Sequence, residues 1–153
     1  MLSRTLAGAA MTVAVMGVAA TPAAAATTGS QSFTILSNND HGPVLATGPI
    51  SGHGRLQSLS DTQDRILFPG GSVLLTHATT SNNDSFNEQT CTVLIDESGT
   101  YRLTGESGVY AGATGTGTFH AFGLVSATKT ASGCSDHARA LVMVRATGTT
   151  TTP

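Results

Sequence analysis

Residues 99–123 read GTYRLTGESGVYAGATGTGTFHAFG, and this stretch decides the fold. Aromatic and apolar residues that favour strands recur in it between glycines. The glycines stand at positions 99, 105, 108, 112, 115, 117 and 123. Such spacing predicts short strands joined by tight turns and bulges. The stretch therefore indicates an all-β fold, and it carries no recognisable chemistry.

The rest of the chain repeats the same pattern around this stretch. Alternation of apolar and polar residues predicts further strands, among them residues 31–37, 72–79, 88–96 and 137–147. Clusters of Asn, Asp, Gly and Pro separate them and favour turns, among them residues 38–43 and the polar segment 61–64. About eight short strands without a helical window are typical of a β-sandwich or a closed barrel. We favour a small closed antiparallel β-barrel, because glycines permit sharp bends and closure removes exposed strand edges.

The last strand has the cleanest alternation in the chain and indicates which face is buried. Its small side chains share one face and are predicted to point inward: Ala138, Ala140, Val142, Val144 and Ala146. Residues 148–153 hold no apolar side chain to bury, which predicts a disordered tail. We therefore expect the barrel domain to span residues 27–147.

Residues 1–26 have the pattern of a cleavable signal peptide. Arg4 supplies the positive end, residues 6–20 an uncharged apolar run, and Ala24-Ala25-Ala26 the small side chains that signal peptidase accepts. The alternative, an uncleaved membrane anchor, needs about 20 strongly apolar residues, whereas this run is rich in Ala and Gly. No cysteine near the cleavage point could carry a lipid. We expect cleavage after Ala26 and a secreted, extracellular protein free of the membrane.

Charge and cysteine count limit the classes of partner. The chain carries 7 Lys and Arg against 9 Asp and Glu, and this weakly acidic balance argues against nucleic acid and anionic membranes. Its two cysteines, Cys91 and Cys134, are expected to form one disulfide, as an even count does in exported proteins. The alternative, a reactive thiol or metal-ligand pair, would want a CxxC spacing or a flanking His. We expect no metal and no cofactor.

Histidines are the main candidates for acid–base or binding chemistry near neutral pH. They stand at positions 41, 53, 77, 120 and 137, none in a known catalytic or metal-binding spacing. His77 and His120 lie in apolar strands, where an imidazole must find a partner or line a cavity. If both face one lumen with Tyr101 or Glu106, they form the polar end of an apolar pocket. These four are the candidate ligand-binding residues, and the sequence identifies no catalytic residue.

Part of the chain resembles a known family. Gly99-Thr100-Tyr101 followed by residues 108–119 is similar to the GTGxYxGATGxGTY segment of small secreted actinobacterial proteins related to the allene oxide cyclase and dirigent barrels. Residues 68–72, His77 and Cys91-Thr92 are similar in kind and order to what precedes that segment there. The resemblance covers roughly residues 45–123 and implies a β-barrel. The chain reads Glu-Ser-Gly at 106–108 where the family usually has Gly-Thr-Gly, and the resemblance assigns no catalytic residue.

Two functions of different classes follow from these observations. The first is a non-catalytic barrel that binds a small apolar ligand, or a protein partner, in its lumen or at its rim. The second is an isomerase or cyclase like the plant enzymes, whose apolar cavity folds a reactive substrate. We favour the first. The resemblance also implies that an oligomer is possible, since dirigent and cyclase relatives are often oligomeric.

Overall fold

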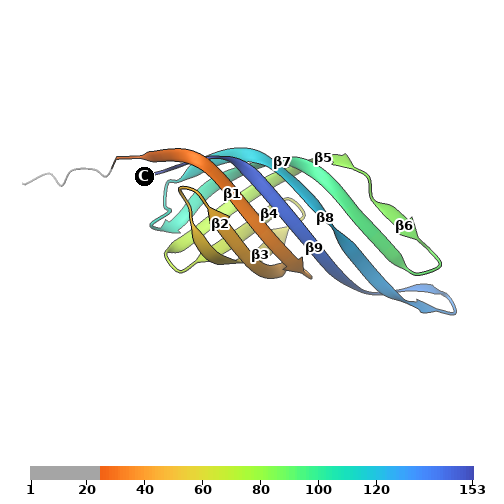
Figure 1. Ribbon diagram of the computed structural model, residues 1–153. Coiled ribbons are helices and arrows are strands. Elements are labelled where there is room, and N and C mark those ends of the chain that lie inside the picture. The colour runs from red at the N-terminus through yellow and green to blue at the C-terminus, as the bar shows by residue number, and fades with distance from the viewer. Residues whose placement is uncertain (1–24) are drawn as a thin grey trace, which may run out of the picture.

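The computed structural model describes residues 25–153, and all regular structure in this range is β-strand (Figure 1). The strands are β1 (Thr27–Asn38), β2 (His41–Thr47), β3 (Gly52–Ser60), β4 (Gln63–Phe68), β5 (Gly71–Asn82), β6 (Ser85–Asn87), β7 (Thr92–Gly108), β8 (Thr114–Thr130) and β9 (Gly133–Thr152). The predicted signal peptide lies almost wholly outside the described residues. Within them, the structure contains no helix of the length and apolarity that a membrane crossing requires.

Eight of the described strands form a closed antiparallel barrel, which confirms the predicted fold. Each strand from β1 to β4 pairs with the next along the chain, β5 pairs with β7, and β7, β8 and β9 follow in order. Strand β9 then pairs with β1, from Thr27 opposite Thr152 to Asn38 opposite Leu141. This pairing closes the barrel and satisfies both backbone edges of every strand within it. The ninth strand, β6, pairs with β7 outside the barrel.

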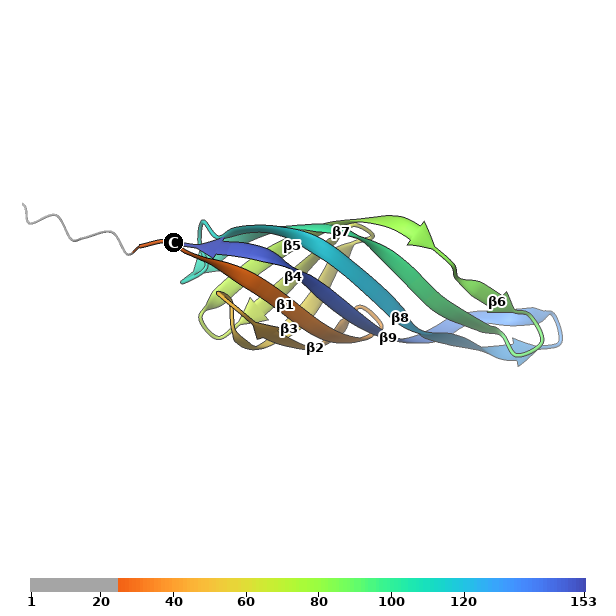
Figure 2. The same ribbon diagram turned by 45° about the horizontal axis from the view of Figure 1, so that its top comes forward.

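The three longest strands continue beyond the barrel as an extension. Strands β7, β8 and β9 have 17, 17 and 20 residues, whereas β2 and β4 have 7 and 6. Their outer parts project from one barrel end together with β6 (Figures 1 and 2). We call this part, residues 85–93, 125–130 and 133–140, the extension. Its tip carries the Cys91–Cys134 disulfide, with the two Cα atoms 5.5 Å apart, which confirms the predicted pairing.

Gly108 and Gly112, both with positive φ, lie at the tight turn between β7 and β8, as predicted. The other glycines of residues 99–123 lie inside two long strands, so the prediction of short strands is wrong. Gly99 pairs with Phe119, and Gly117 pairs with Tyr101, on the adjacent strands β7 and β8. A Cβ atom on Gly99 or on Gly117 would lie 2.6 Å from the facing aromatic ring. Each ring therefore occupies the space that a side chain would take. A glycine opposite an aromatic residue keeps the backbone ladder intact and makes room for the ring.

The C-terminal residues are ordered, which corrects the predicted tail. Residues 148–152 form the end of β9 and pair with residues 27–31 of β1. On their other side they pair with residues 114–117 of β8, and Thr150 is fully buried. Threonine is β-branched and favours strands, and two backbone ladders satisfy this segment without apolar side chains. The barrel therefore extends to Thr152.

The hydrophobic core fills the barrel end where the chain termini lie, which we call the closed end. Its buried side chains come from seven strands and two loops: Phe33, Ile35, Val44, Ala46, Ile50, Leu56, Ile66, Phe68, Val73, Leu75, Tyr101, Leu103, Ala113 and Ala146. Ile50, from the β2–β3 loop, is fully buried. The buried Gln31 amide holds this loop: Nε2 donates to the carbonyl oxygens of Ile50 at 2.8 Å and Thr47 at 3.0 Å, and Oε1 accepts from the Ile50 N–H at 2.9 Å. The loop thereby plugs the closed end.

Candidate functional site

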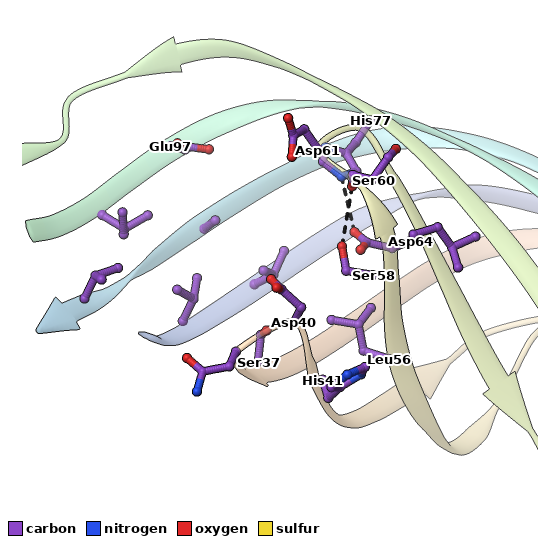
Figure 3. A pocket seen from close by; sticks show the side chains of 17 residues that line it. Ser37, Asp40, His41, Leu56, Ser58, Ser60, Asp61, Asp64, His77 and Glu97 are labelled. Atoms are coloured by element: carbon purple, nitrogen blue, oxygen red, sulfur yellow. Dashed lines mark hydrogen bonds and ion pairs between the residues drawn. The ribbon is translucent and has the colours of Figure 1, made fainter. Parts of the chain in front are cut away.

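A cavity enters the barrel from the opposite end, which we call the open end (Figure 3). It has an outer chamber of about 590 Å³ and an inner chamber of about 140 Å³. The two share lining residues: Leu56, Asp64, His77, Glu97, Ala121 and Val144. They are therefore one continuous space that leads from the mouth to the core.

Small side chains on β8 and β9 leave room for this cavity. Ala121, Val144 and Ala146 line the inner chamber, and Val142 lines the outer one. The strand alternation predicted from residues 137–147 is thus confirmed for the three residues of β9. At the closed end, by contrast, large side chains such as Phe33 fill the lumen.

The inner chamber is mostly apolar, and one tyrosine forms part of its wall. Its wall includes Ile35, Leu75 and Phe119, together with Tyr101. The Tyr101 side chain is buried, and its hydroxyl has no hydrogen-bond partner among the described residues. Burial raises the pKa of Tyr101, because the phenolate would lose its hydration. Tyr101 therefore stays neutral at physiological pH.

His77 lies where the two chambers meet. Its Nε2 is 3.2 Å from Oδ2 of Asp64, and both side chains are about one quarter exposed, at 24% and 21%. The His77 ring also packs edge-on against Phe119, with the ring centroids 5.7 Å apart. The alternation of β5 brings His77 inward after Leu75, and that of β4 brings Asp64 inward before Ile66. The pair fixes one imidazole at the neck of the cavity.

Carboxylates surround the mouth of the outer chamber (Figure 3). The charged and titratable lining residues are Asp40, Asp61, Asp64, Glu97, His41 and His77, and none of the lining residues is Lys or Arg. Asp40 reaches the rim through a two-residue turn, in which Asn39 and Asp40 have φ values of 47° and 69°. Positive φ at both positions is what a type I′ hairpin turn requires. The sequence indicated turns at residues 38–43 and 61–64, but it did not show that they meet at one opening.

Two of the four candidate residues from the sequence, His120 and Glu106, lie outside the cavity. His120 points outward between Phe119 and Ala121, and its Nε2 is 2.8 Å from Oδ1 of Asp96, with both side chains about half exposed. Phe119 and Ala121 take the inward positions of this strand. The condition that both histidines face one lumen is therefore not met, because only His77 lines the cavity, together with Tyr101.

Glu106 belongs to a polar cluster on the outer wall. It accepts hydrogen bonds from Arg65, at 2.7 Å from Nε and 2.9 Å from Nη2, and the Ser72 hydroxyl donates to it at 3.3 Å. The hydrogen bond from Arg65 lowers the pKa of Glu106 and raises the pKa of Arg65. Glu106 thus joins β7 to β4 across β5, and it does not line the cavity.

The described residues of the cavity offer few groups for covalent chemistry. His77 pairs with Asp64, and no hydroxyl or thiol of the described residues hydrogen-bonds to its imidazole. The described part of the chain also contains no group of three His, Cys, Asp or Glu residues placed to hold a metal ion. What remains is an apolar chamber, a neck with one imidazole–carboxylate pair and an acidic mouth.

Comparison of the chain with protein-family models, with curated proteins and with solved structures finds no match. The class of protein is therefore defined by its own fold: an eight-stranded up-and-down barrel, plugged at one end and hollow at the other.

Proposed function

We propose that this protein is a secreted, non-catalytic binding module that takes a small, largely apolar molecule into its barrel cavity. The observation that carries the proposal is the apolar inner chamber, which continues into a wider outer chamber of about 590 Å³. Pockets with mostly apolar walls and a few placed polar groups are typical of small-molecule sites. Secretion rests on the predicted signal peptide, and the Cys91–Cys134 disulfide is compatible with an oxidising compartment.

An isomerase or cyclase, as the resemblance to allene oxide cyclase implies, is the second candidate. The observation in its favour is that His77 and Tyr101 line the same apolar chamber. A cavity that folds a reactive substrate needs few polar groups beyond those that position it. No nucleophile of the described residues is bonded to His77, so such an enzyme would act by folding its substrate and not by covalent catalysis.

The proposal is tested by binding of N-phenyl-1-naphthylamine, a neutral apolar probe that fluoresces when it leaves water. We expect saturable fluorescence enhancement with one site per barrel. Ala121→Phe should abolish it, because Ala121 lines both chambers and a ring there would fill the neck. Thr118→Phe is the matched control, since Thr118 lies on the same strand with its side chain exposed outside the barrel.

Val144→Phe is a second blocking variant in case Ala121→Phe does not fold, because Val144 also lines both chambers. The proposal fails if the probe does not bind the wild-type protein, or if it binds equally well to folded variants with a filled neck. Native mass spectrometry of the protein secreted by its own host then identifies a natural ligand by its bound mass.

A further inference from the structure

We infer that the ligand is a cationic amphiphile, bound with its positive group at the acidic mouth and its apolar body in the chamber. This inference deepens the proposed function and rests on it. It is carried by the way in which charge and apolar surface are divided within one cavity.

The carboxylates at the mouth give it charge of one sign, and two of them have no partner. Asp40, Asp61 and Asp64 come from the β1–β2 and β3–β4 hairpins, and Glu97 comes from β7. Among the described residues, no hydrogen bond or ion pair reaches the carboxylates of Asp40 and Asp61, and no Lys or Arg lines the cavity. Carboxylates around an opening with apolar walls concentrate a negative potential there. That potential favours a cation and repels fatty acids and other anions.

The opposite wall of the mouth is apolar. It is formed by Ile95, Val125 and Val142, on the extension side of the outer chamber. The same face of the extension continues away from the barrel in a cross-strand row: Phe86, Val93, Val125 and Ala140. Phe86 in this row is 62% exposed. An occupant at the mouth thus meets carboxylates on the hairpin side and apolar surface on the other, which is the environment that an amphiphile requires.

A bare metal ion fits the mouth less well than an organic cation. A metal site needs several ligands close together, and no three His, Cys, Asp or Glu residues of the described chain are so placed. The carboxylates instead stand around an outer chamber of about 590 Å³. This spacing suits a bulky group such as an alkylammonium.

The test is displacement of bound N-phenyl-1-naphthylamine by three dodecyl compounds, each kept below its micelle concentration. Dodecyltrimethylammonium, dodecanol and dodecanoate have the same chain and differ in head-group charge. We expect the ammonium to displace the probe at a concentration about tenfold or more below that of dodecanoate at low salt. Added sodium chloride should reduce this preference, because salt screens exposed charges.

A variant at the rim tests whether the mouth causes the preference. Asp40→Asn/Asp61→Asn should reduce the preference to about threefold or less, since it removes charges that no other group compensates. The preference is the ratio of the two displacing concentrations measured on the same variant, so a change in its affinity for the neutral probe cancels. Glu88→Gln/Asp136→Asn is the matched control: it removes the same charge from residues that do not line the cavity, and it should keep the full preference.

The outcomes separate the inference from the proposed function. If the probe binds in the barrel but all three compounds displace it equally, the inference is overturned and the proposed function stands. The inference is also overturned if the control variant loses the preference as fully as the rim variant does, because net charge would then be the cause. If the probe does not bind at all, the proposed function itself fails.

Discussion

The two ends of this barrel are formed by the same strands, but one end is filled with side chains and the other is hollow. At the closed end, the buried Ile50 plugs the lumen and the Gln31 amide binds its backbone. At the open end, the turns place Asp40 and Asp61 around a cavity. The comparison indicates that packing at one end stabilises the fold and leaves the other end free to hold groups that repel one another.

The difference between the closed end and the open end develops along individual strands. The inward positions of β4 run from Phe68 through Ile66 to Asp64, and Asp64 is at the open end. Those of β5 run from Val73 through Leu75 to His77 in the same sense. In each strand, inward and outward positions alternate throughout, but the inward side chains change from apolar to polar toward the open end. The lumen is therefore apolar and filled at one end, and polar and hollow at the other.

Removing the disulfide should have the largest effect on stability, and it should act at the open end. The Cys91→Ala/Cys134→Ala variant opens a loop with a sequence separation of 43 residues. The chain-entropy model then gives a loss of about 4 kcal/mol in the free energy of unfolding, measured in urea. Hydrogen exchange should rise in residues 125–140 and less around Ile50. Equal exchange at both ends would show that the extension and the plug unfold as one unit.

Gln31→Ala should destabilise the closed end and cause the second-largest loss in the free energy of unfolding. It removes the partners of the Ile50 N–H and carbonyl, both of which are buried. Buried backbone groups left unpaired cost about 3 kcal/mol together. Gln63→Ala is the control, because Gln63 is exposed, and it should change the free energy of unfolding by less than about 0.5 kcal/mol. A small effect of Gln31→Ala would mean that the plug does not depend on this amide.

Tyr101→Phe should stabilise the unliganded protein, because it removes a buried hydroxyl without a partner. We expect a gain of about 1 kcal/mol in the free energy of unfolding. Loss of stability instead would show that water or a ligand satisfies the hydroxyl in solution. A second variant, Tyr110→Phe, allows Tyr101 to be titrated alone. The sequence has two tyrosines, so this variant keeps only Tyr101.

Absorbance titration of that Tyr110→Phe variant should give a phenol pKa above 10.0 for Tyr101. Because the pKa is higher in the folded than in the unfolded chain, the associated stability is present below pH 10 and is lost as the pH rises. A ligand in the inner chamber should shift the titration. A pKa at or below 10.0 would contradict the burial of the phenol.

Local patterns in the sequence predicted the barrel, but they do not show which residues pair across neighbouring strands. The alternation in residues 137–147 is local, and it placed Val142, Val144 and Ala146 on the cavity side. Pairing of Gly99 with Phe119 is a cross-strand relation, so the strand lengths were misjudged. The threonines after residue 147 were taken for a tail because their order comes from backbone ladders and not from apolar burial.

The candidate site was predicted in part for the same reason. His77 was found because it lies in an apolar strand, and Tyr101 was named as a residue that could share its lumen. Asp64 was overlooked as a turn residue, although it precedes the buried Ile66 by two positions and so shares its face. This two-residue spacing was the available signal. That Asp40 joins Asp61 at one rim follows from closure of the barrel, which no local pattern contains.

Glu106 gives the smallest expected effect, because its ion pair with Arg65 is on the outer wall and exposed to solvent. The hydrogen bond from Arg65 lowers the pKa of Glu106 from its ordinary value of 4.5. A carboxyl with a lowered folded-state pKa contributes stability above pH 4.5, and this stability is lost as the pH falls through the folded-state pKa. Glu106→Gln should therefore reduce the melting temperature slightly at neutral pH and hardly at all in acid. Its probe binding should match the wild type, whereas a change in binding would mean that the outer wall and the cavity are coupled.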